Sequence, residues 1–230
     1  MGTGFSEIIQ DAMYFMNDVR WHEQLASDPA QFFRAKSAFV ISAIPRFNCP
    51  PNMQEFLTYT PPMSDDTSYT ATEAQTSGFV IETGKTGFQL CSAAMENKQS
   101  NGSVFLSPVD CSYDDETGDV TINADVAAGA SLVLDFYTDG TFDNVLDNEQ
   151  KRILALAVAC DWYFQFANDY LGIANLVTDK SFSIKSPSEH IRANTERMRY
   201  LREQLRSELH AYEQRLYKVQ FTPKTMIPKV

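Results

Sequence analysis

Basic residues are almost absent from the middle of this 230-residue chain. Between Pro61 and Gln150 the only bases are Lys85 and Lys98, against sixteen acidic residues, whereas residues 151–230 carry thirteen bases and eight acids. The net charge of −11 argues against a surface built to grip nucleic acid, because such surfaces use Lys and Arg to displace the counterions of phosphates. It still allows a protein past which DNA slides without being held.

The chain also lacks a long apolar run and a cysteine framework. No stretch approaches the ~18 consecutive apolar residues of a membrane span, and the N-terminal region has acids where a signal peptide has bases. We therefore expect a soluble protein that is not secreted by that route and has no membrane partner. The four cysteines have no C-x-x-C spacing, which favours a reducing compartment over a zinc site or a set of disulfides.

Catalytic and ligand-binding patterns are weak throughout. Gly84-Lys85-Thr86 ends like a phosphate-binding loop, but Phe79 stands where the first glycine belongs. No histidine has a second histidine three or four residues away, no Gly-x-Ser-x-Gly elbow occurs, and the acidic runs lack the calcium-loop spacing. We expect no metal, no cofactor and no enzymatic activity, with residues 84–86 forming a hairpin turn.

Residues 1–60 have helical periodicity. Apolar residues recur every three or four positions from about Ser6 to Arg20, which predicts one amphipathic helix. A second helix is expected after Asp28, because Asp28-Pro29-Ala30-Gln31 combines an N-cap acceptor, a first-position proline and a third-position glutamine. Pro45 should stop it. The apolar segment Phe39–Ile41 is also compatible with a short strand.

The acidic middle predicts strands and turns. Residues 60–77 are rich in Pro, Ser, Thr and Asp, which indicates an exposed connection. Turn signals at Asp114–Gly118 and Asp139-Gly140 separate short β-type runs. Five such runs are expected: Gly78–Ile81, Gly87–Cys91, Val104–Ser107, Val120–Ala124 and Ser131–Tyr137.

Two helices are predicted after residue 146. Asp147-Asn148-Glu149-Gln150 is a capping-box variant, followed by an apolar face up to about Tyr170, with Gly172 placed to end the helix. Ser186-Pro187-Ser188-Glu189 should start a longer helix that reaches about Tyr217.

The longer helix carries a narrow apolar stripe on a charged surface. Such a stripe needs a partner helix, either in this chain or in a neighbouring copy, and we assign it to a subunit interface. Arg192, Arg199, Arg202 and Arg206 lie on one side of this helix, with Glu196 and Glu203 among them. That mixture favours a solvated or intersubunit face over a DNA-binding stripe. The apolar stripe that we assign to the subunit interface consists of Met198, Leu201, Leu205, Leu209, Tyr212 and Leu216.

These elements predict an α+β fold in which a helical scaffold holds an inserted antiparallel β module. The helical core would comprise residues 1–60 and 146–217, and the acidic β module residues 61–145. Residues 218–230 combine bases, prolines and apolar side chains, which indicates an extended arm that docks on another surface.

The order of these parts resembles the head-to-tail adaptor (connector) proteins of tailed bacteriophages, the ring proteins beneath the portal. The likeness rests on the N-terminal helical pair, the β insertion, Tyr137-Thr138-Asp139-Gly140-Thr141-Phe142 leading into a helix with Trp162, the long charged helix and the C-terminal arm. It covers the chain in outline and is most specific from Asp135 to Leu216.

The resemblance implies a virion structural protein of the neck, made in the host cytoplasm, without catalytic residues. It implies a homomeric ring, usually of twelve copies, between the portal and a stopper or tail protein, with double-stranded DNA passing through unbound. Asp114, Asp115, Glu116 and Asp119 would then face the lumen or the tail. The arm would dock on the portal through Phe221, Pro223, Met226, Ile227, Pro228 and Val230.

An alternative is a receptor- or carbohydrate-binding β module on a helical stalk. Stalk-borne β domains are often trimeric, and such a module would need exposed aromatic side chains. The aromatics available in the β module are Phe79, Phe88, Phe105 and Tyr113.

Overall fold

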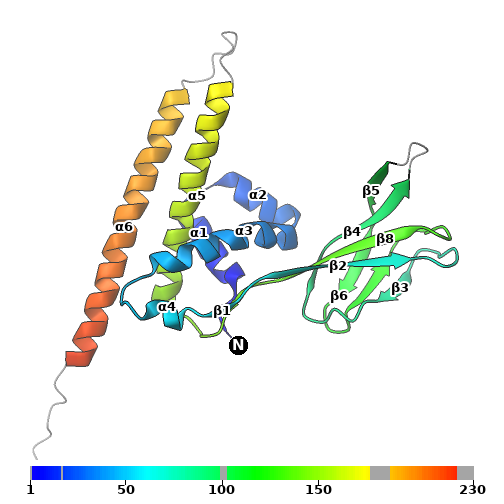
Figure 1. The fold of residues 1–230 in the computed structure, drawn as a ribbon, viewed down its shortest axis with the longest axis horizontal. Coiled ribbons are helices and arrows are strands. Elements are labelled where there is room, and N and C mark those ends of the chain that lie inside the picture. Colours follow the sequence, from blue (N-terminus) through cyan, green and yellow to red (C-terminus); the bar gives the residue numbers. More distant parts are fainter. Residues whose placement is uncertain (1, 17, 99–102, 177–186, 222–230) are drawn as a thin grey trace, which may run out of the picture. The chain divides into compact units, whose positions relative to one another are not determined.

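The computed structural model describes residues 2–16, 18–98, 103–176 and 187–221 and has an α+β fold (Figure 1). The chain divides into two compact units. Unit 1 contains Met1–Asp18, Ala38–Tyr59 and Phe142–Val230, and unit 2 contains Val19–Ser37 and Thr60–Thr141. The sequence-based boundaries differ from this division, since they placed all of residues 1–60 in the helical core.

Unit 1 is built around the first half of helix α5 (Asn148–Leu176). Its residues Ile153 to Cys160 are each at most 1% exposed, so this stretch is buried on every side rather than along one stripe. Three of the eight are alanines, which let neighbouring helices approach closely. Helix α1 (Phe5–Met16) packs on α5 and buries the predicted apolar face, although it ends at Met16 rather than near Arg20.

Helix α6 (Pro187–Phe221) runs antiparallel to α5 in unit 1 (Figure 1). This unit also contains the short 3-10 helix η1 (Ile44–Arg46), which includes Pro45, and helix α4 (Met53–Phe56). Helix α5 continues through Gly172, so the expected stop at that glycine is wrong. Packing and hydrogen bonding of a long helix can outweigh the cost of about 1 kcal/mol for one internal glycine.

Unit 2 contains two antiparallel sheets that pack face to face. The four-stranded sheet has the order β2-β8-β4-β5 and the three-stranded sheet the order β3-β7-β6. Leu132, Leu134 and Phe136 alternate along β8 and are fully buried in the core between the sheets. The seven strands of these sheets are Met63–Thr70 (β2), Phe79–Glu82 (β3), Gln89–Lys98 (β4), Val104–Pro108 (β5), Cys111–Asp114 (β6), Asp119–Ile122 (β7) and Ser131–Thr138 (β8).

Strand β2 corrects the prediction of an exposed connection over residues 60–77. It pairs with β8 along its whole length, from Met63 opposite Thr138 to Thr70 opposite Ser131. Its sequence gave no apolar alternation because β2 is an edge strand without a single fully buried side chain. A two-residue strand β1 (Tyr59–Thr60) pairs with β9 (Thr141–Phe142).

Residues 84–86 are also not a hairpin turn. Strand β3 pairs with β7, whereas β4 pairs with β8 and β5. The Gly84-Lys85-Thr86 segment therefore links one sheet to the other. The turn at Asp114–Gly118 does close a hairpin, between β6 and β7, as the sequence predicts.

Helices α2 (Val19–Ser27) and α3 (Pro29–Ala43) follow α1. The cap predicted for α3 is confirmed, since the Gln31 amide donates to Asp28 Oδ1 at 3.0 Å, and Phe39–Ile41 is helical. Within unit 2, Trp21 packs edge-on against Phe32 at 5.4 Å, and Arg34 forms an ion pair with Asp135 of β8. This ion pair gives a physical reason why residues 19–37 group with the strands.

Candidate docking surfaces

The apolar stripe of α6 lies largely inside the chain. Leu201 is fully buried, and Leu205 and Tyr212 are each 6% exposed, while Met198, Leu209 and Leu216 are partly buried. Helix α5 is the partner helix. Assigning Leu201, Leu205 and Tyr212 to a subunit interface is therefore wrong, because their surfaces are already covered within one copy.

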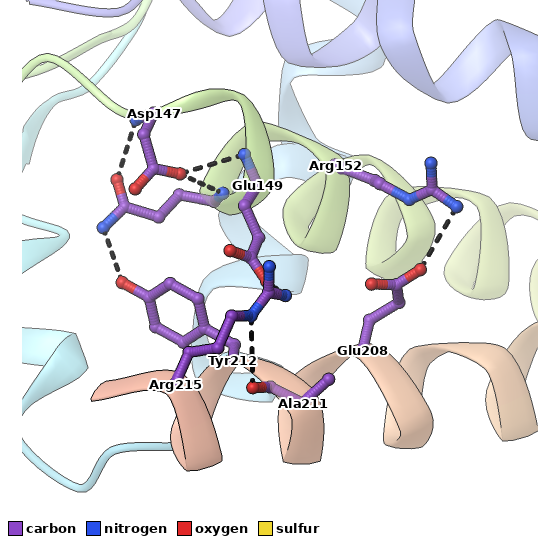
Figure 2. A network of polar contacts seen from close by, with 8 residues as sticks. Asp147, Glu149, Arg152, Glu208, Ala211, Tyr212 and Arg215 are labelled. Carbon is purple, nitrogen blue, oxygen red and sulfur yellow. Dashed lines mark hydrogen bonds and ion pairs between the residues drawn. The ribbon is translucent and has the colours of Figure 1, made fainter. Parts of the chain in front are cut away.

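A polar network fixes the start of α5 to α6 (Figure 2). Asp147 Oδ1 accepts from the amides of Glu149 at 2.9 Å and Gln150 at 2.8 Å, and the Asp147 amide donates to Gln150 Oε1 at 2.9 Å. This confirms the predicted capping box. Gln150 Nε2 also donates to the Tyr212 hydroxyl at 2.8 Å, so the same glutamine caps α5 and holds α6.

Two ion pairs flank that hydrogen bond along the α5–α6 contact. Arg152 lies 3.1 Å from Glu208, and Arg215 pairs with Glu149 (Figure 2). Tyr212 is further packed edge-on against Phe47, with ring centroids 5.4 Å apart. These contacts leave α6 with one side fixed on α5 and the other side outward.

A group of arginines that we call the arginine face combines Arg199, Arg202 and Arg206 on the outward side of α6 with Arg46 of η1. Two adjoining hollows lie among them, and Arg202 and Arg206 line both. Met198, Leu205 and Leu209 supply apolar lining, and Glu203 is the one acid that lines either hollow. Such a surface combines positive charge with partly desolvated contacts, as anion-binding interfaces often do.

The four arginines differ in how they are engaged. Arg46 pairs with Asp161, which is 9% exposed and also accepts from Ser42 Oγ at 2.8 Å. The Arg202 guanidinium lies 5.9 Å from the ring centroid of Phe164. Arg199 and Arg206 are exposed and form no ion pair with any side chain that the structure describes. These two remain available to an external anion.

The acidic residues predicted to face a lumen or tail lie at the β6–β7 turn, here called the acidic hairpin (Asp114–Asp119). Asp114 Oδ1 accepts from the amides of Glu116 at 3.0 Å and Thr117 at 3.4 Å. Gly118 has φ of +79°, and a Cβ there would lie 2.6 Å from the Lys85 amide nitrogen. The turn is therefore held rigidly while Asp115 and Glu116 stay exposed.

A second group of carboxylates lies on the other face of β8, and the sequence did not indicate it. Asp135 stands opposite Asp66 in the β2–β8 register and pairs with Arg34. Burial raises the pKa of Asp135, Arg34 opposes that rise, and Asp66 adds to it. Burial also raises the pKa of the neighbouring Cys91 thiol to about 11, so this thiol is protonated and unreactive at neutral pH.

The aromatic side chains considered for a binding module are mostly engaged within unit 2. Phe79 packs against Tyr69, and both Phe88 and Tyr113 pack against Phe136. Only Phe105 is exposed, at 48%, together with Val104 and Leu106 on edge strand β5.

The docking arm falls almost entirely outside the described residues. Helix α6 continues through Phe221, so the prediction that residues 218–221 belong to an extended arm is wrong. The other predicted arm residues lie beyond α6: Pro223, Met226, Ile227, Pro228 and Val230. The Ser186 cap of α6 is likewise outside the described part of the chain.

Within the described ranges, no three His, Cys, Asp or Glu side chains are placed to share a metal ion. No helix among these residues is both long and apolar enough to cross a membrane. No protein-family model matches the chain, and no curated protein matches it.

Proposed function

We propose that this chain is a virion structural protein, a head-to-tail adaptor that forms a ring between the portal and a stopper or tail protein of a tailed bacteriophage. The role is mechanical rather than catalytic. The ring extends the channel through which double-stranded DNA leaves the head.

The order of elements is the observation that carries this proposal. Helix α1 packs on α5, α6 runs antiparallel to α5, and all seven longer strands fall between α4 and α5. This is the arrangement of parts on which the resemblance to the connector proteins rests. Fold analogy of this kind suggests a role without assigning a site.

The charge distribution supports the same role. DNA must pass a ring without being held, and an excess of acid over base reduces phosphate contacts. The basic excess of residues 151–230 suits acidic neighbours in an assembly, and the residues that follow α6 would form the arm that docks on the portal.

Gene order and particle mass test this proposal. A portal gene and a capsid gene just upstream would favour it strongly. Size-exclusion chromatography with light scattering separates it from a stalk-borne binding module, because that module predicts a trimer. An adaptor predicts either a ring of many copies or a monomer that assembles on the portal, so a stable trimer would contradict the proposal.

The receptor-binding alternative has one observation in its favour. Val104, Phe105 and Leu106 are about half exposed on an edge strand, and natural edges usually avoid such apolar runs. The engagement of Phe79, Phe88 and Tyr113 in the core leaves this alternative with few aromatic side chains for a ligand.

A further inference from the structure

We infer that the arginine face of one copy binds the acidic hairpin of a second copy, so that copies associate head to tail. This inference rests on the proposed function and deepens it by naming the contact between subunits. The contact pairs Arg199 and Arg206 with Asp115 and Glu116.

Charge complementarity favours this occupant. Arg199 and Arg206 have no ion pair with the described side chains, and the same holds for Asp115 and Glu116. Two guanidinium groups therefore meet two carboxylates, and guanidinium–carboxylate pairs can be bidentate. The chain carries both charges itself, thirteen bases against eight acids in residues 151–230 and two against sixteen in residues 61–150, so each added copy supplies one surface of each sign.

Both surfaces are accessible. Asp114 to Thr117 are exposed at the tip of the acidic hairpin, and the arginine face holds two adjoining hollows with the partly buried Met198 and Leu209 in their walls. Asp114 and Gly118 hold the turn in one conformation. Little conformational entropy is therefore lost when the hairpin binds.

Glu203 disfavours a nucleic acid in the same place. This carboxylate lines one of the hollows, where it would face a continuous row of phosphates. A short acidic tip can bind beside Arg199 and Arg206 and leave Glu203 in solvent.

The two surfaces of the contact are different, so the association is heterologous. Heterologous contacts close into rings when the rotation between copies allows it, and otherwise extend as filaments. The contact made by a single hairpin buries little surface area. When a ring closes, however, the last contact forms within one assembly, which stabilises the ring as a whole. This contact replaces the lumen or tail as the predicted environment of Asp115 and Glu116.

Charge reversal in the full-length chain tests the contact. Sedimentation velocity over an about hundredfold concentration range compares the wild type with Asp115→Lys/Glu116→Lys and with Arg199→Glu/Arg206→Glu. Each double variant should weaken self-association at least about tenfold. Raising NaCl from about 50 to about 500 mM should do the same to the wild type.

Mixing the two double variants is the most specific test of this contact. Each variant presents two surfaces of the same sign and should stay monomeric alone. In an equal mixture, the acidified face of one binds the basic hairpin of the other, and the wild-type face binds the wild-type hairpin. Association should therefore return in the mixture as alternating copies.

Matched controls exclude a general charge effect. Glu73→Lys/Asp110→Lys changes the charge of unit 2 by the same amount at exposed positions outside the acidic hairpin. Arg192→Glu, a single reversal with half the charge change of Arg199→Glu/Arg206→Glu, alters α6 outside the hollows. Both controls should associate as the wild type does.

Several results would overturn the contact. It is wrong if the wild type associates and the double reversals do not weaken it, or if the mixture stays monomeric. It is also wrong if Arg199→Glu/Arg206→Glu removes binding to a double-stranded oligonucleotide without affecting association, because the face then binds phosphate. A third contradicting result would be a monomer whose compactness does not depend on concentration and is lost in the charge-reversed variants. The acidic hairpin would then bind the arginine face of its own chain rather than that of a second copy.

A wild type that stays monomeric at low salt overturns this contact without contradicting the proposed function. Imaging with portal rings tests the proposed function separately. Failure of the contact and failure of the function are therefore distinguishable.

Discussion

Gln150 links the start of α5 to α6, because its Nε2 donates to the Tyr212 hydroxyl at 2.8 Å while its Oε1 accepts from the Asp147 amide at 2.9 Å. Gln150 is 7% exposed and Tyr212 6%. Replacing Gln150 by Ala leaves buried polar groups without partners and should lower the free energy of unfolding by about 1–3 kcal/mol. Urea denaturation followed by circular dichroism measures this.

Tyr212→Phe supplies the matched variant for that hydrogen bond. A double-mutant cycle with Gln150→Ala and Tyr212→Phe should show a coupling energy of about 0.5–3 kcal/mol. Additive effects would mean that the two side chains do not interact in solution.

The N-cap of α5 should contribute measurably to stability. Asp147→Ala removes the acceptor of two amides and should cost about 1 kcal/mol in the free energy of unfolding. Asp143 is exposed, its side chain caps no helix, and it lies four residues away, so Asp143→Ala is the control. Equal effects of the two substitutions would contradict the capping role.

The pKa of Asp135 should respond in opposite directions to the loss of its two charged neighbours, Asp66 and Arg34. The pKa of Asp135 is raised above 3.8, so its contribution to stability is present below that value and is lost as pH rises through the folded-state pKa. Asp66→Asn removes one cause of the rise and should lower the pKa of Asp135. Arg34→Gln should raise it further.

Carbon-13 NMR of the Asp135 carboxyl group measures these shifts. The two variants should move the pKa in opposite directions from that of the wild type. A shift in the same direction in both would show that general unfolding, rather than the local charges, governs the titration.

The buried thiols should be inert in the folded protein. Cys160 is 1% exposed and Cys91 is 9% exposed, and burial raises the pKa of each to about 11. Reaction with a thiol-specific reagent at neutral pH should label the half-buried Cys49 first, and Cys91 and Cys160 only on unfolding. Mass spectrometry of the labelled peptides would reveal early labelling of Cys160, which would contradict its burial.

Local signals in the sequence predicted the starts of α3, α5 and α6 and several strands, but not the helices α2 and α4. The caps at Asp28 and Asp147 involve residues within three positions, so their chemistry is visible in a short window. Strand β2 was missed because its partner β8 lies far along the chain and its own side chains are polar. The period of α6 predicted a partner helix but could not say whether that helix belonged to the same chain.

The candidate site was only partly visible for the same reason. The sequence placed Arg199, Arg202 and Arg206 on one side of a helix, but Arg46 joins them only through folding. Arg46 and its partner Asp161 are 115 residues apart, and Arg34 and Asp135 are 101 residues apart. Neither separation leaves a local pattern.

The C-terminal arm should be needed for docking and not for folding. A truncation after Tyr217 should stay soluble and unfold at the temperature of the full chain, because Glu208, Tyr212 and Arg215, which join α6 to α5, all lie before that residue. It should fail to join portal rings in a co-sedimentation assay. Normal joining by the truncated chain would show that the arm has another role.

Electron microscopy of portal rings incubated with the full-length chain tests the central claim most directly. The adaptor proposal predicts class averages in which one additional ring, built from many copies of this chain, lies on one end of each portal. Portal rings that remain bare when the chain is present in large excess would contradict it.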